Sequence, residues 1–315
     1  MAAARSITQR WVARNLPARP DRAHKADFGR LLVVAGSLEY PGAALLAALG
    51  AMRAGAGVVR VATADSVAAR LAGSVPELTW MALDEEAPGL IAPGGWRRLT
   101  TEARSYDALV IGPGLGRQAA TQRRTRQLIG AVTLPVVVDA DALNALAAEA
   151  RWWRAIRAPL VLTPHPGEFA RLAGAAPDSA DDDARAEAAA EAAARWQQVV
   201  VLKGARTVVA EPGGEIYRAD VATPALATAG SGDVLSGVIG AFLTSLYVLR
   251  VVRAIFWGPK STDPHFQYLP DAQGTEWVAL VLLVFVIVLF GIAPSLAISP
   301  IDSTTVPLLM RLGAL

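Results

Sequence analysis

The chain has 315 residues, and its 30 lysines and arginines are nearly balanced by 28 aspartates and glutamates, which leaves a net charge of +2. This balance excludes the strong basic field of a protein whose main partner is nucleic acid. The absence of cysteine excludes a disulfide scaffold, a thiolate metal site and a cysteine nucleophile, and the hydrophobic fraction of 53% excludes an intrinsically disordered chain.

Residues 1–23 form a basic lead-in to the first predicted strand. Five arginines fall in this segment, and no acidic residue comes before Asp21. The composition is similar to that of a transit peptide, but the segment lacks the apolar stretch of a secretion signal. We therefore interpret it as a basic surface segment and expect the domain that follows to be cytoplasmic.

Residues 24–243 alternate between short β-branched runs and alanine-rich stretches. The predicted strands are Leu31–Ala35, Val58–Ala62, Ala108–Ile111, Val136–Asp139, Leu160–Thr163, Val199–Leu202 and Thr207–Ala210. The predicted helices include Pro41–Ala54, Gln118–Gly130, Asp141–Ala150 and Asp183–Trp196, the last preceded by Ser179 and Asp182 in capping-box spacing. This alternation predicts a mostly parallel sheet covered by helices on both faces, which binds its ligand at the carboxyl ends of the strands.

Turns rich in small residues follow two of the predicted strands. Tyr40-Pro41-Gly42-Ala43 comes after the first strand and would let a flat ligand lie close to the backbone, although tight packing of helix on sheet explains the same residues. Gly112-Pro113-Gly114-Leu115-Gly116 follows the strand at 108–111 and lacks the Gly-Lys-Ser/Thr ending of a Walker A loop. Each turn by itself is a weak signal of a binding site.

Polar side chains follow the next two predicted strands. A proline on each side fixes His165 in an extended loop, where it could bind a nucleotide ring or phosphate; a solvated loop histidine is the alternative. Glu168 could position Mg²⁺ through a water molecule. Asp139, Asp141 and Asn144 could share that role, and Asp141 is equally suited to cap a helix.

Two turns near the end of the alternating region carry residues suited to bind phosphate. In the turn 203–207, Lys203 can reach a phosphate and Gly204 lets backbone amides approach it. Gly230-Ser231-Gly232-Asp233 precedes a predicted helix, whose N-terminal amides would form an anion site. Asp233 would then accept a proton from an attacking hydroxyl as phosphoryl transfer begins, and an aspartate-capped helix after a glycine turn is the alternative.

In this order, the motifs resemble the ADP-dependent NAD(P)H-hydrate dehydratase family of the ribokinase-like superfamily. The segments that carry the resemblance are His24-Lys25-x-x-Phe28-Gly29, Gly36-Ser37, Tyr40–Ala43, Arg53–Gly57, Gly112–Gly116, Val138–Asn144, Thr163–Glu168, Lys203-Gly204 and Ala227–Asp233. The resemblance covers about residues 8–243. It implies a three-layer α/β/α fold, a homo-oligomer (a tetramer), and a lyase that uses ADP, or ATP, to dehydrate the S-form of NADH or NADPH hydrate.

The resemblance also implies roles for single residues. Asp233 would be the catalytic base that assists phosphorylation of the C6 hydroxyl of the hydrate, from which phosphate then leaves. The implied hydrate site consists of Ala43, Gly114, His165 and Asp233. The implied adenine-nucleotide site consists of Lys203, Gly204, Ala205, Arg206, Thr207 and Gly232, and the implied magnesium-associated pair is Asn144 and Glu168.

Residues 244–315 depart from the family's pattern and resemble the C-terminal tail of the antiporter-like membrane subunit (chain M) of NADH:quinone oxidoreductase. The carrying residues are Leu243-Thr244-x-x-Tyr247-x-Leu249-Arg250, Arg253-x-Ile255-Phe256-x-Gly258-Pro259, Glu276 and Gly291–Pro294. The 23 residues 277–299 carry no charge, which predicts a membrane-spanning helix and membrane association, with a buried core helix as the alternative. We expect a dehydratase domain, 24–243, truncated at its C-terminal end and joined to this tail by a natural fusion or by an error of sequence assembly.

Two other functions stay open at this point. One is a ribokinase-like kinase for a small molecule such as a vitamin precursor, which would share the Gly-x-Gly-Asp turn but release a stable phosphorylated product. The other is a membrane-anchored inactive fusion or fragment whose spanning helix is the functional part. That chain would lack the lysine and glutamate relay expected inside the membrane helices of a proton pump.

Overall fold

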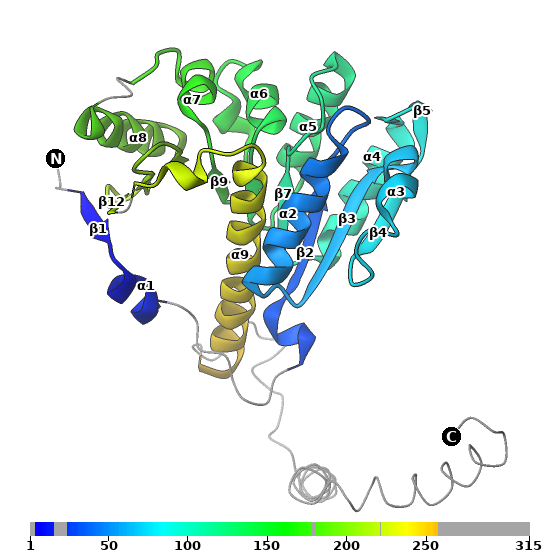
Figure 1. Ribbon diagram of the computed structural model, residues 1–315, viewed down its shortest axis with the longest axis horizontal. Helices are drawn as coiled ribbons and strands as arrows, with labels where there is room; N and C mark the ends of the chain where they lie inside the picture. Colours follow the sequence, from blue (N-terminus) through cyan, green and yellow to red (C-terminus); the bar gives the residue numbers. More distant parts are fainter. Residues whose placement is uncertain (1–3, 16–23, 178–180, 221, 258–315) are drawn as a thin grey trace, which may run out of the picture. The chain divides into compact units, whose positions relative to one another are not determined.

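The computed structural model describes residues 4–15, 24–177, 181–220 and 222–257 (Figure 1). Its strands are β1 (Arg5–Ile7), β2 (Arg30–Val34), β3 (Val58–Ala64), β4 (Thr79–Leu83), β5 (Glu85–Ala87), β6 (Leu90–Ile91), β7 (Ala108–Ile111), β8 (Val136–Val138), β9 (Leu160–Leu162), β10 (Val199–Leu202), β11 (Val208–Ala210) and β12 (Ile216–Ala219). Its α-helices are α1 (Gln9–Asn15), α2 (Pro41–Ala54), α3 (Asp65–Leu71), α4 (Pro93–Glu102), α5 (Ala119–Ala131), α6 (Asp141–Ala147), α7 (Pro166–Ala173), α8 (Asp182–Trp196) and α9 (Ser231–Trp257).

One large sheet organises the described part of the chain. Its ten strands follow the order β1-β12-β11-β10-β9-β8-β7-β2-β3-β4. All neighbouring pairs are parallel except the two that involve β11, which runs antiparallel to β10 and β12. The predicted mostly parallel sheet is therefore confirmed. Because β2, β3 and β7 to β10 point the same way, the loops after them gather at one edge.

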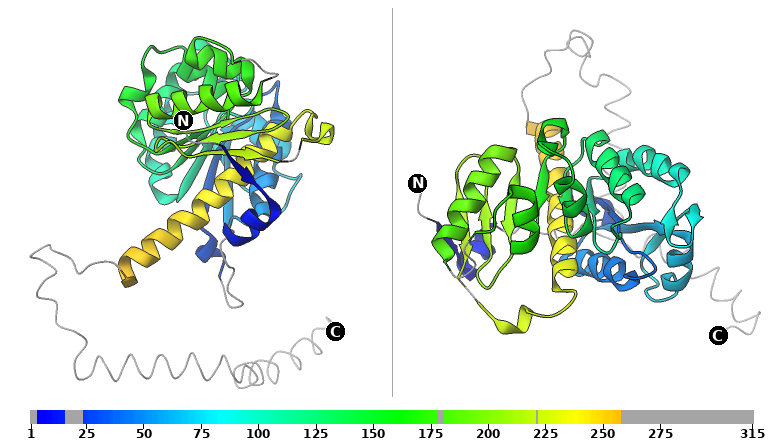
Figure 2. Two further views of the ribbon diagram at one scale, coloured as in Figure 1. Left: turned by 90° about the vertical axis from the view of Figure 1, so that its left-hand side faces the viewer. Right: turned by 90° about the horizontal axis from the view of Figure 1, so that it is seen from above.

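Helices cover both faces of this sheet and give two separate cores. Leu31 and Val33 of β2 pack with alanines of α2 and with Ala241 of α9. Leu32 and Val34 face the opposite core, which includes side chains of α4 to α8. Figure 2 shows the three layers, with blue α2 and yellow α9 on one side of the strands and the green helices on the other. The predicted three-layer architecture is confirmed.

Helices α2 and α9 touch backbone to backbone. A Cβ atom on Gly237 would overlap the carbonyl oxygen of Ala47, and one on Gly50 would lie 2.5 Å from the carbonyl oxygen of Val234. Such an approach is open only to glycine, because any side chain would separate the helices. Both helices begin at the edge where the strands end, so this contact fixes their first turns relative to each other (Figure 1).

Most of the predicted elements form within one or two residues of their expected ends, and a few differ. The helix expected to run to Ala150 ends at Ala147. The cap of α8 is Asp181, whose Oδ1 accepts the N–H groups of Asp183 (2.8 Å) and Ala184 (3.1 Å), and so the expected cap at Ser179 and Asp182 was wrong. Ser179 itself lies outside the described residues.

The two ends of the chain carry features that the sequence patterns did not specify. The basic lead-in contributes β1, which pairs in parallel with β12, and the short helix α1. Helix α9 continues as one element past residue 243 to Trp257. The hydrophobic segment 277–299 lies outside the described residues. Within the part that the structure describes, none of the helices combines the length and apolar character needed to cross a membrane.

Candidate functional site

A cleft of about 500 Å³ opens where the parallel strands end. It is lined by Glu39, Tyr40, Ala43, Gly114, Gly116, Arg117, Ala140, Asp141, Asn144, Glu168 and Asp233. These residues come from the segments that follow β2, β7, β8 and β9 and from the first turn of α9. Of the four residues expected at the hydrate site, Ala43, Gly114 and Asp233 therefore lie in one cleft. The expected magnesium pair, Asn144 and Glu168, lines the same cleft.

Gly114 closes one wall of the cleft against the start of α2. It has φ +62°, and a Cβ atom there would lie 2.7 Å from the Cβ of Tyr40 and 2.8 Å from the Cβ of Ala43. A larger residue would push the loop away from the helix, because real Cβ contacts are essentially never this short. The glycine turn and the small residues of α2 thus fit each other directly.

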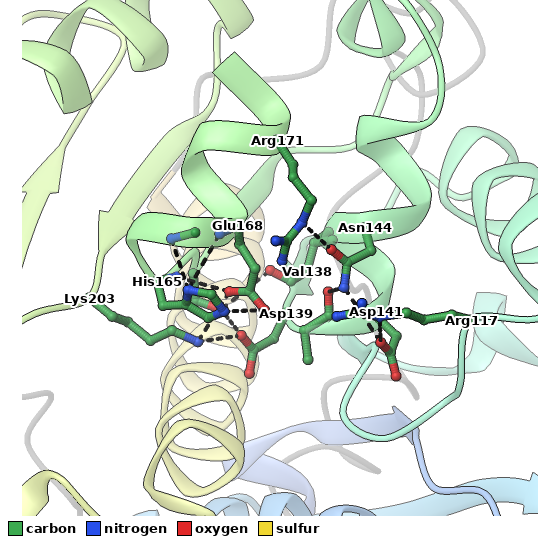
Figure 3. A network of polar contacts seen from close by, with 12 residues as sticks. Arg117, Val138, Asp139, Asp141, Asn144, His165, Glu168, Arg171 and Lys203 are labelled. Atoms are coloured by element: carbon green, nitrogen blue, oxygen red, sulfur yellow. Dashed lines mark hydrogen bonds and ion pairs between the residues drawn. The ribbon is translucent and has the colours of Figure 1, made fainter. Parts of the chain in front are cut away.

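An almost completely buried carboxylate, Asp139, follows β8 and holds Lys203. Asp139 is 1% exposed, and its Oδ1 accepts hydrogen bonds from Thr163 Oγ1 (2.8 Å) and from Lys203 Nζ (2.8 Å). Lys203 Nζ also lies 3.8 Å from Glu168 Oε2 (Figure 3). A Cβ atom on Gly232 would stand 3.5 Å from the same nitrogen, so the lysine reaches the first turn of α9.

Asp233, in that first turn, has an unusually basic carboxylate. Its pKa rises from 3.8 to about 6, first because the group is partly buried and second because the negative charge of Asp139 is near. Lys203 lowers the pKa and Asp141 raises it, and both effects are smaller. A carboxylate with a pKa of about 6 is ionised at neutral pH and is a stronger proton acceptor than an ordinary aspartate.

The backbone between the two carboxylates after β8 is strained. Ala140 has φ +47° and ψ −117°, a conformation that an alanine adopts at a cost of roughly 1–3 kcal/mol. On one side of it Asp139 contacts Lys203, and on the other Asp141 Oδ2 accepts the N–H of Gly116 at 2.9 Å. The strained residue therefore lies in the chain between two acids that bond to different loops, and Figure 3 shows these two acids, Asp139 and Asp141.

The expected magnesium pair is already engaged by protein donors. Asn144 Oδ1 accepts from Arg171 Nε at 2.8 Å, and Glu168 Oε2 accepts from the N–H of His165 at 2.9 Å. Among the described residues, no cluster of three or more His, Cys, Asp or Glu could hold a metal ion. Mg²⁺ bound to nucleotide phosphates keeps several waters and needs few protein contacts. These residues therefore fit a water-mediated contact with the ion and not a direct protein cage.

His165 has a structural task that the sequence did not reveal. Its Nδ1 accepts the N–H groups of Gly167 (3.0 Å) and Glu168 (3.4 Å), and Glu168 bonds back to the His165 backbone, which makes a capping box at the start of α7. The side chain is 51% exposed and is not among the residues that line the cleft. The ring borders the polar network around Lys203 (Figure 3).

The turn 203–207 rests on a residue that sequence reasoning missed, Arg185 of α8. The Arg185 side chain is 2% exposed and donates to the carbonyl oxygens of Leu202, Lys203 and Arg206 at 3.0–3.3 Å. The side chain of Arg206 points to Asp182 (3.2 Å), and Thr207 Oγ1 donates to the carbonyl of Gly204 at 3.4 Å. Arg185 shares the buried stripe of Ala189, Ala193 and Trp196, and a charge in that stripe was the available signal.

Comparison with known families gives the same assignment as the motifs. Residues 31–263 match the family model described as NAD(P)H-hydrate dehydratase. The chain is 45% identical over 235 residues to the bifunctional NAD(P)H-hydrate repair enzyme Nnr of Moorella thermoacetica, which covers 75% of this chain and 44% of that protein. It is 38% identical to the ADP-dependent (S)-NAD(P)H-hydrate dehydratase of Bacillus subtilis, which covers 74% of this chain and 78% of that protein. The chain thus spans less than half the length of the first curated relatives it matches.

Solved structures agree with this result. The ADP/ATP-dependent NAD(P)H-hydrate dehydratase of Bacillus subtilis, co-crystallised with ATP/Mg²⁺, gives a TM-score of 0.63 at 34% identity and covers 85% of this chain and 93% of that one. A ribokinase-like superfamily protein of Enterococcus faecalis, at 23% identity and a TM-score of 0.62, supports the fold alone and covers 78% and 84% of the two chains. The resemblance of residues 244–315 to a membrane subunit stays a prediction. The chain belongs to the NAD(P)H-hydrate dehydratase family.

Proposed function

We propose that this chain dehydrates the S-form of NADH or NADPH hydrate at the expense of ADP or ATP. One observation carries the proposal above all: Asp233, with its raised pKa, lies in the same cleft as Ala43 and Gly114 and beside the ammonium group of Lys203. A base and a cation are what transfer of a phosphoryl group to a hydroxyl requires.

In the proposed reaction, Asp233 accepts the proton of the C6 hydroxyl. The hydroxyl oxygen forms a bond to the terminal phosphorus of the nucleotide as the bond to the rest of the nucleotide breaks. Phosphate then leaves C6 with the electron pair of the C–O bond, the neighbouring ring carbon loses a proton to water, and the dihydronicotinamide double bond is restored. Phosphorylation is useful because phosphate is a far better leaving group than hydroxide.

The nucleotide is proposed to lie on Lys203, Gly204, Ala205, Arg206, Thr207 and Gly232. Support comes from Lys203 Nζ near the first turn of α9, where the N-terminal amides of a helix favour an anion. Mg²⁺ bound with the nucleotide would neutralise charge on the transferred phosphoryl group. Asn144 and Glu168 are proposed to contact that ion through water. His165 is proposed to contact the hydrate from the border of the cleft.

Incubation with NADH hydrate, ADP and Mg²⁺ tests the proposal. Absorbance at 340 nm is expected to return, with release of inorganic phosphate in equal amount, and Asp233→Asn is expected to slow both at least about 100-fold. A ribokinase-like small-molecule kinase would instead give a persistent phosphoester and no absorbance. A folded protein that restores no absorbance would refute the proposal.

Three finer assignments are also proposals that separate experiments address. The catalytic domain is proposed to act in the cytoplasm. It is also proposed to form a homotetramer, and sedimentation equilibrium would measure the mass of that assembly. Membrane association through residues 277–299 predicts that the protein stays in the pellet when membranes are extracted with carbonate. Complete release into the supernatant would refute that association and leave the enzymatic proposal intact.

A further inference from the structure

Arg185 is a buried cation that contacts the backbone of the proposed nucleotide-binding turn. Its Nη1 donates to the carbonyl of Arg206 at 3.0 Å, and its Nη2 donates to the carbonyls of Leu202 (3.3 Å) and Lys203 (3.2 Å). Its single carboxylate partner is Asp182 at 3.3 Å among the described residues, and Asp182 also pairs with Arg206. An arginine is rarely buried so fully unless several groups engage it.

These bonds fix the direction of the peptide groups in the turn. In a trans peptide the carbonyl of one residue and the N–H of the next point in opposite directions. The carbonyl of Leu202 points to Arg185, and the next N–H, of Lys203, donates away from it to the carbonyl of Pro164 at 2.8 Å. By the same geometry, the N–H groups of Gly204 and Thr207 point away from the guanidinium.

Those two N–H groups are available to a ligand, because no acceptor among the described residues engages them. Neither Gly204 nor Thr207 donates a backbone hydrogen bond there to another residue. The two N–H groups and the ammonium group of Lys203 are hydrogen-bond donors on one turn. Backbone N–H groups grouped in this way bind phosphate oxygens. The guanidinium on the inner side of the turn adds positive charge without blocking the approach of a ligand.

The same contact explains why the residue after Lys203 is glycine. A Cβ atom on Gly204 would overlap the guanidinium of Arg185. On the inner side of the turn, the Arg185 side chain leaves no room for any residue larger than glycine. On the outer side, the glycine lets the proposed nucleotide approach the backbone. Gly204 and Arg185 form one unit.

We propose that Arg185 is a positioning residue of the nucleotide site: it holds the peptide groups 203–204 and 206–207 so that their N–H groups donate to nucleotide phosphate. The inference rests on the proposed function. It predicts that Arg185 raises the affinity for nucleotide without affecting the affinity for the hydrate. Arg185 itself is proposed to touch neither ligand.

Arg185→Lys and Arg185→Gln test the inference, because neither side chain has the planar fork of nitrogens with which the guanidinium reaches the three carbonyls. The dissociation constant of ADP is measured by calorimetry without hydrate, and the KM values of both substrates are measured in the assay at 340 nm. ADP affinity is expected to fall at least about tenfold, since several charge-assisted hydrogen bonds to the turn are lost. The KM for the hydrate is expected to change less than about twofold.

Ala189→Gly is the matched control, because it weakens the same helix one turn further on and removes no bond to the turn. It is expected to lower the melting temperature while ADP affinity stays unchanged. If Ala189→Gly weakens ADP binding as much as Arg185→Lys, or if Arg185→Lys binds ADP as the unchanged protein does, the inference is overturned.

Two further results keep the inference separate from failure of folding or of the proposed function. If both Arg185 variants fail to fold, Gly204→Ala replaces them, because its methyl group would displace the guanidinium; wild-type ADP affinity in folded Gly204→Ala would overturn the inference. If the unchanged protein binds no ADP, the proposed function fails and the inference fails with it. If the unchanged protein binds ADP and the Arg185 variants bind it equally well, the inference alone fails.

Discussion

The carboxyl group of Asp233 lies between charges of opposite sign. Burial and the charge of Asp139 favour its protonated form, and Lys203 favours its ionised form. Because Lys203 is itself bonded to Asp139, its charge is shared and only partly offsets the other two effects. Asp233 is therefore kept as a base of intermediate strength, and this has consequences for both activity and stability.

Asp233→Asn is expected to lower turnover at least about 100-fold, the range in which a general base contributes.

The same substitution is expected to stabilise the protein by about 1 kcal/mol at pH 7, reduced from the full effect by the partial exposure of the group. The pKa of about 6, against 3.8, means that between about pH 4 and pH 6 the folded protein retains a proton which the unfolded chain releases, so that at pH 7 the ionised group is less stable in the folded protein than in the unfolded chain. This contribution to stability is full below pH 4 and is lost as pH rises through 6. Thermal unfolding at pH 7 checks it, and an unchanged or lower melting temperature would contradict the assignment.

Activity should depend on pH through the same group. We expect kcat/KM for the hydrate, at saturating ADP, to rise with pH with a midpoint near the Asp233 pKa of about 6. In Asp139→Asn the midpoint should move to lower pH, because a negative charge that raises the pKa of Asp233 is removed. Glu187→Gln removes an exposed charge from α8 and serves as the control. An Asp139→Asn midpoint equal to that of the control would count against the electrostatic coupling.

His165 combines a cap with a proposed ligand contact, and two substitutions separate them. His165→Ala is expected to destabilise the protein by about 1 kcal/mol, because the N–H groups at the start of α7 lose their acceptor. His165→Asn is expected to restore that stability, since asparagine is a good N-cap. Both variants should raise the KM for the hydrate. A normal KM in His165→Asn would leave the histidine with the cap as its single role.

Helices α2 and α9 relate the site to the packing of whole elements. Ala43 is in the first turn of α2 and Asp233 is in the first turn of α9, and both line the cleft. Their spacing depends on the contact of Gly50 and Gly237 with the neighbouring helix backbones. A change at Gly237, one turn from Asp233, should therefore alter the cleft, although no residue that lines the cleft is replaced.

Gly237→Ala is expected to destabilise the protein by about 1–3 kcal/mol, since the added methyl group forces the helices apart. It is also expected to lower kcat/KM. Gly73→Ala is the matched control, because a Cβ atom there meets nothing within 4 Å. Chemical denaturation of both variants compares the free energies of unfolding. Equal stabilities of the two would show that the helices can separate without loss.

Some elements could be predicted from the sequence because their signals are local. Helix α2 forms over the predicted range, since Pro41 suits its first turn and Gly55, at φ +101°, suits the residue after its end. Strand β4, with the sequence Thr-Trp-Met-Ala-Leu, was missed because it contains no valine or isoleucine, the residues that marked the predicted strands. Strand β1 was missed because its partner, β12, lies some 210 residues away in the chain.

The residues of the site were predictable where a local motif marks them, and were missed where they depend on distant partners. The family resemblance implied that Ala43, Gly114, His165 and Asp233 share one site, and the first, second and fourth of these line the cleft at the edge where the strands end. The pairing of Lys203 with Asp139 spans 64 residues and follows no local pattern. Arg185 was missed, although it lies in the buried stripe of α8, because a charged residue on an alanine-rich helix is usually solvated.

The cleft draws on segments spread from Glu39 to Asp233, so a bound ligand should stabilise the whole described domain and not one part of it. ADP at 100 times its dissociation constant is expected to raise the free energy of unfolding by about 2.7 kcal/mol. Thermal unfolding should stay a single transition that moves upward with ADP concentration. Adenosine, which lacks phosphate, is the control and should leave the transition in place. An ADP-independent melting temperature would contradict the proposed nucleotide site.

Helix α9 carries Asp233, the proposed catalytic base, in its first turn and runs unbroken to Trp257. At about 1.5 Å per residue, Trp257 lies about 36 Å along the helix axis from Asp233. An attachment made through that far end, whether a purification handle, a fluorophore or an immobilising resin, would thus stand well clear of the mouth of the cleft. The protein should therefore keep its proposed activity when it is fixed to a surface at that end, because the cleft lies at the other end of the helix.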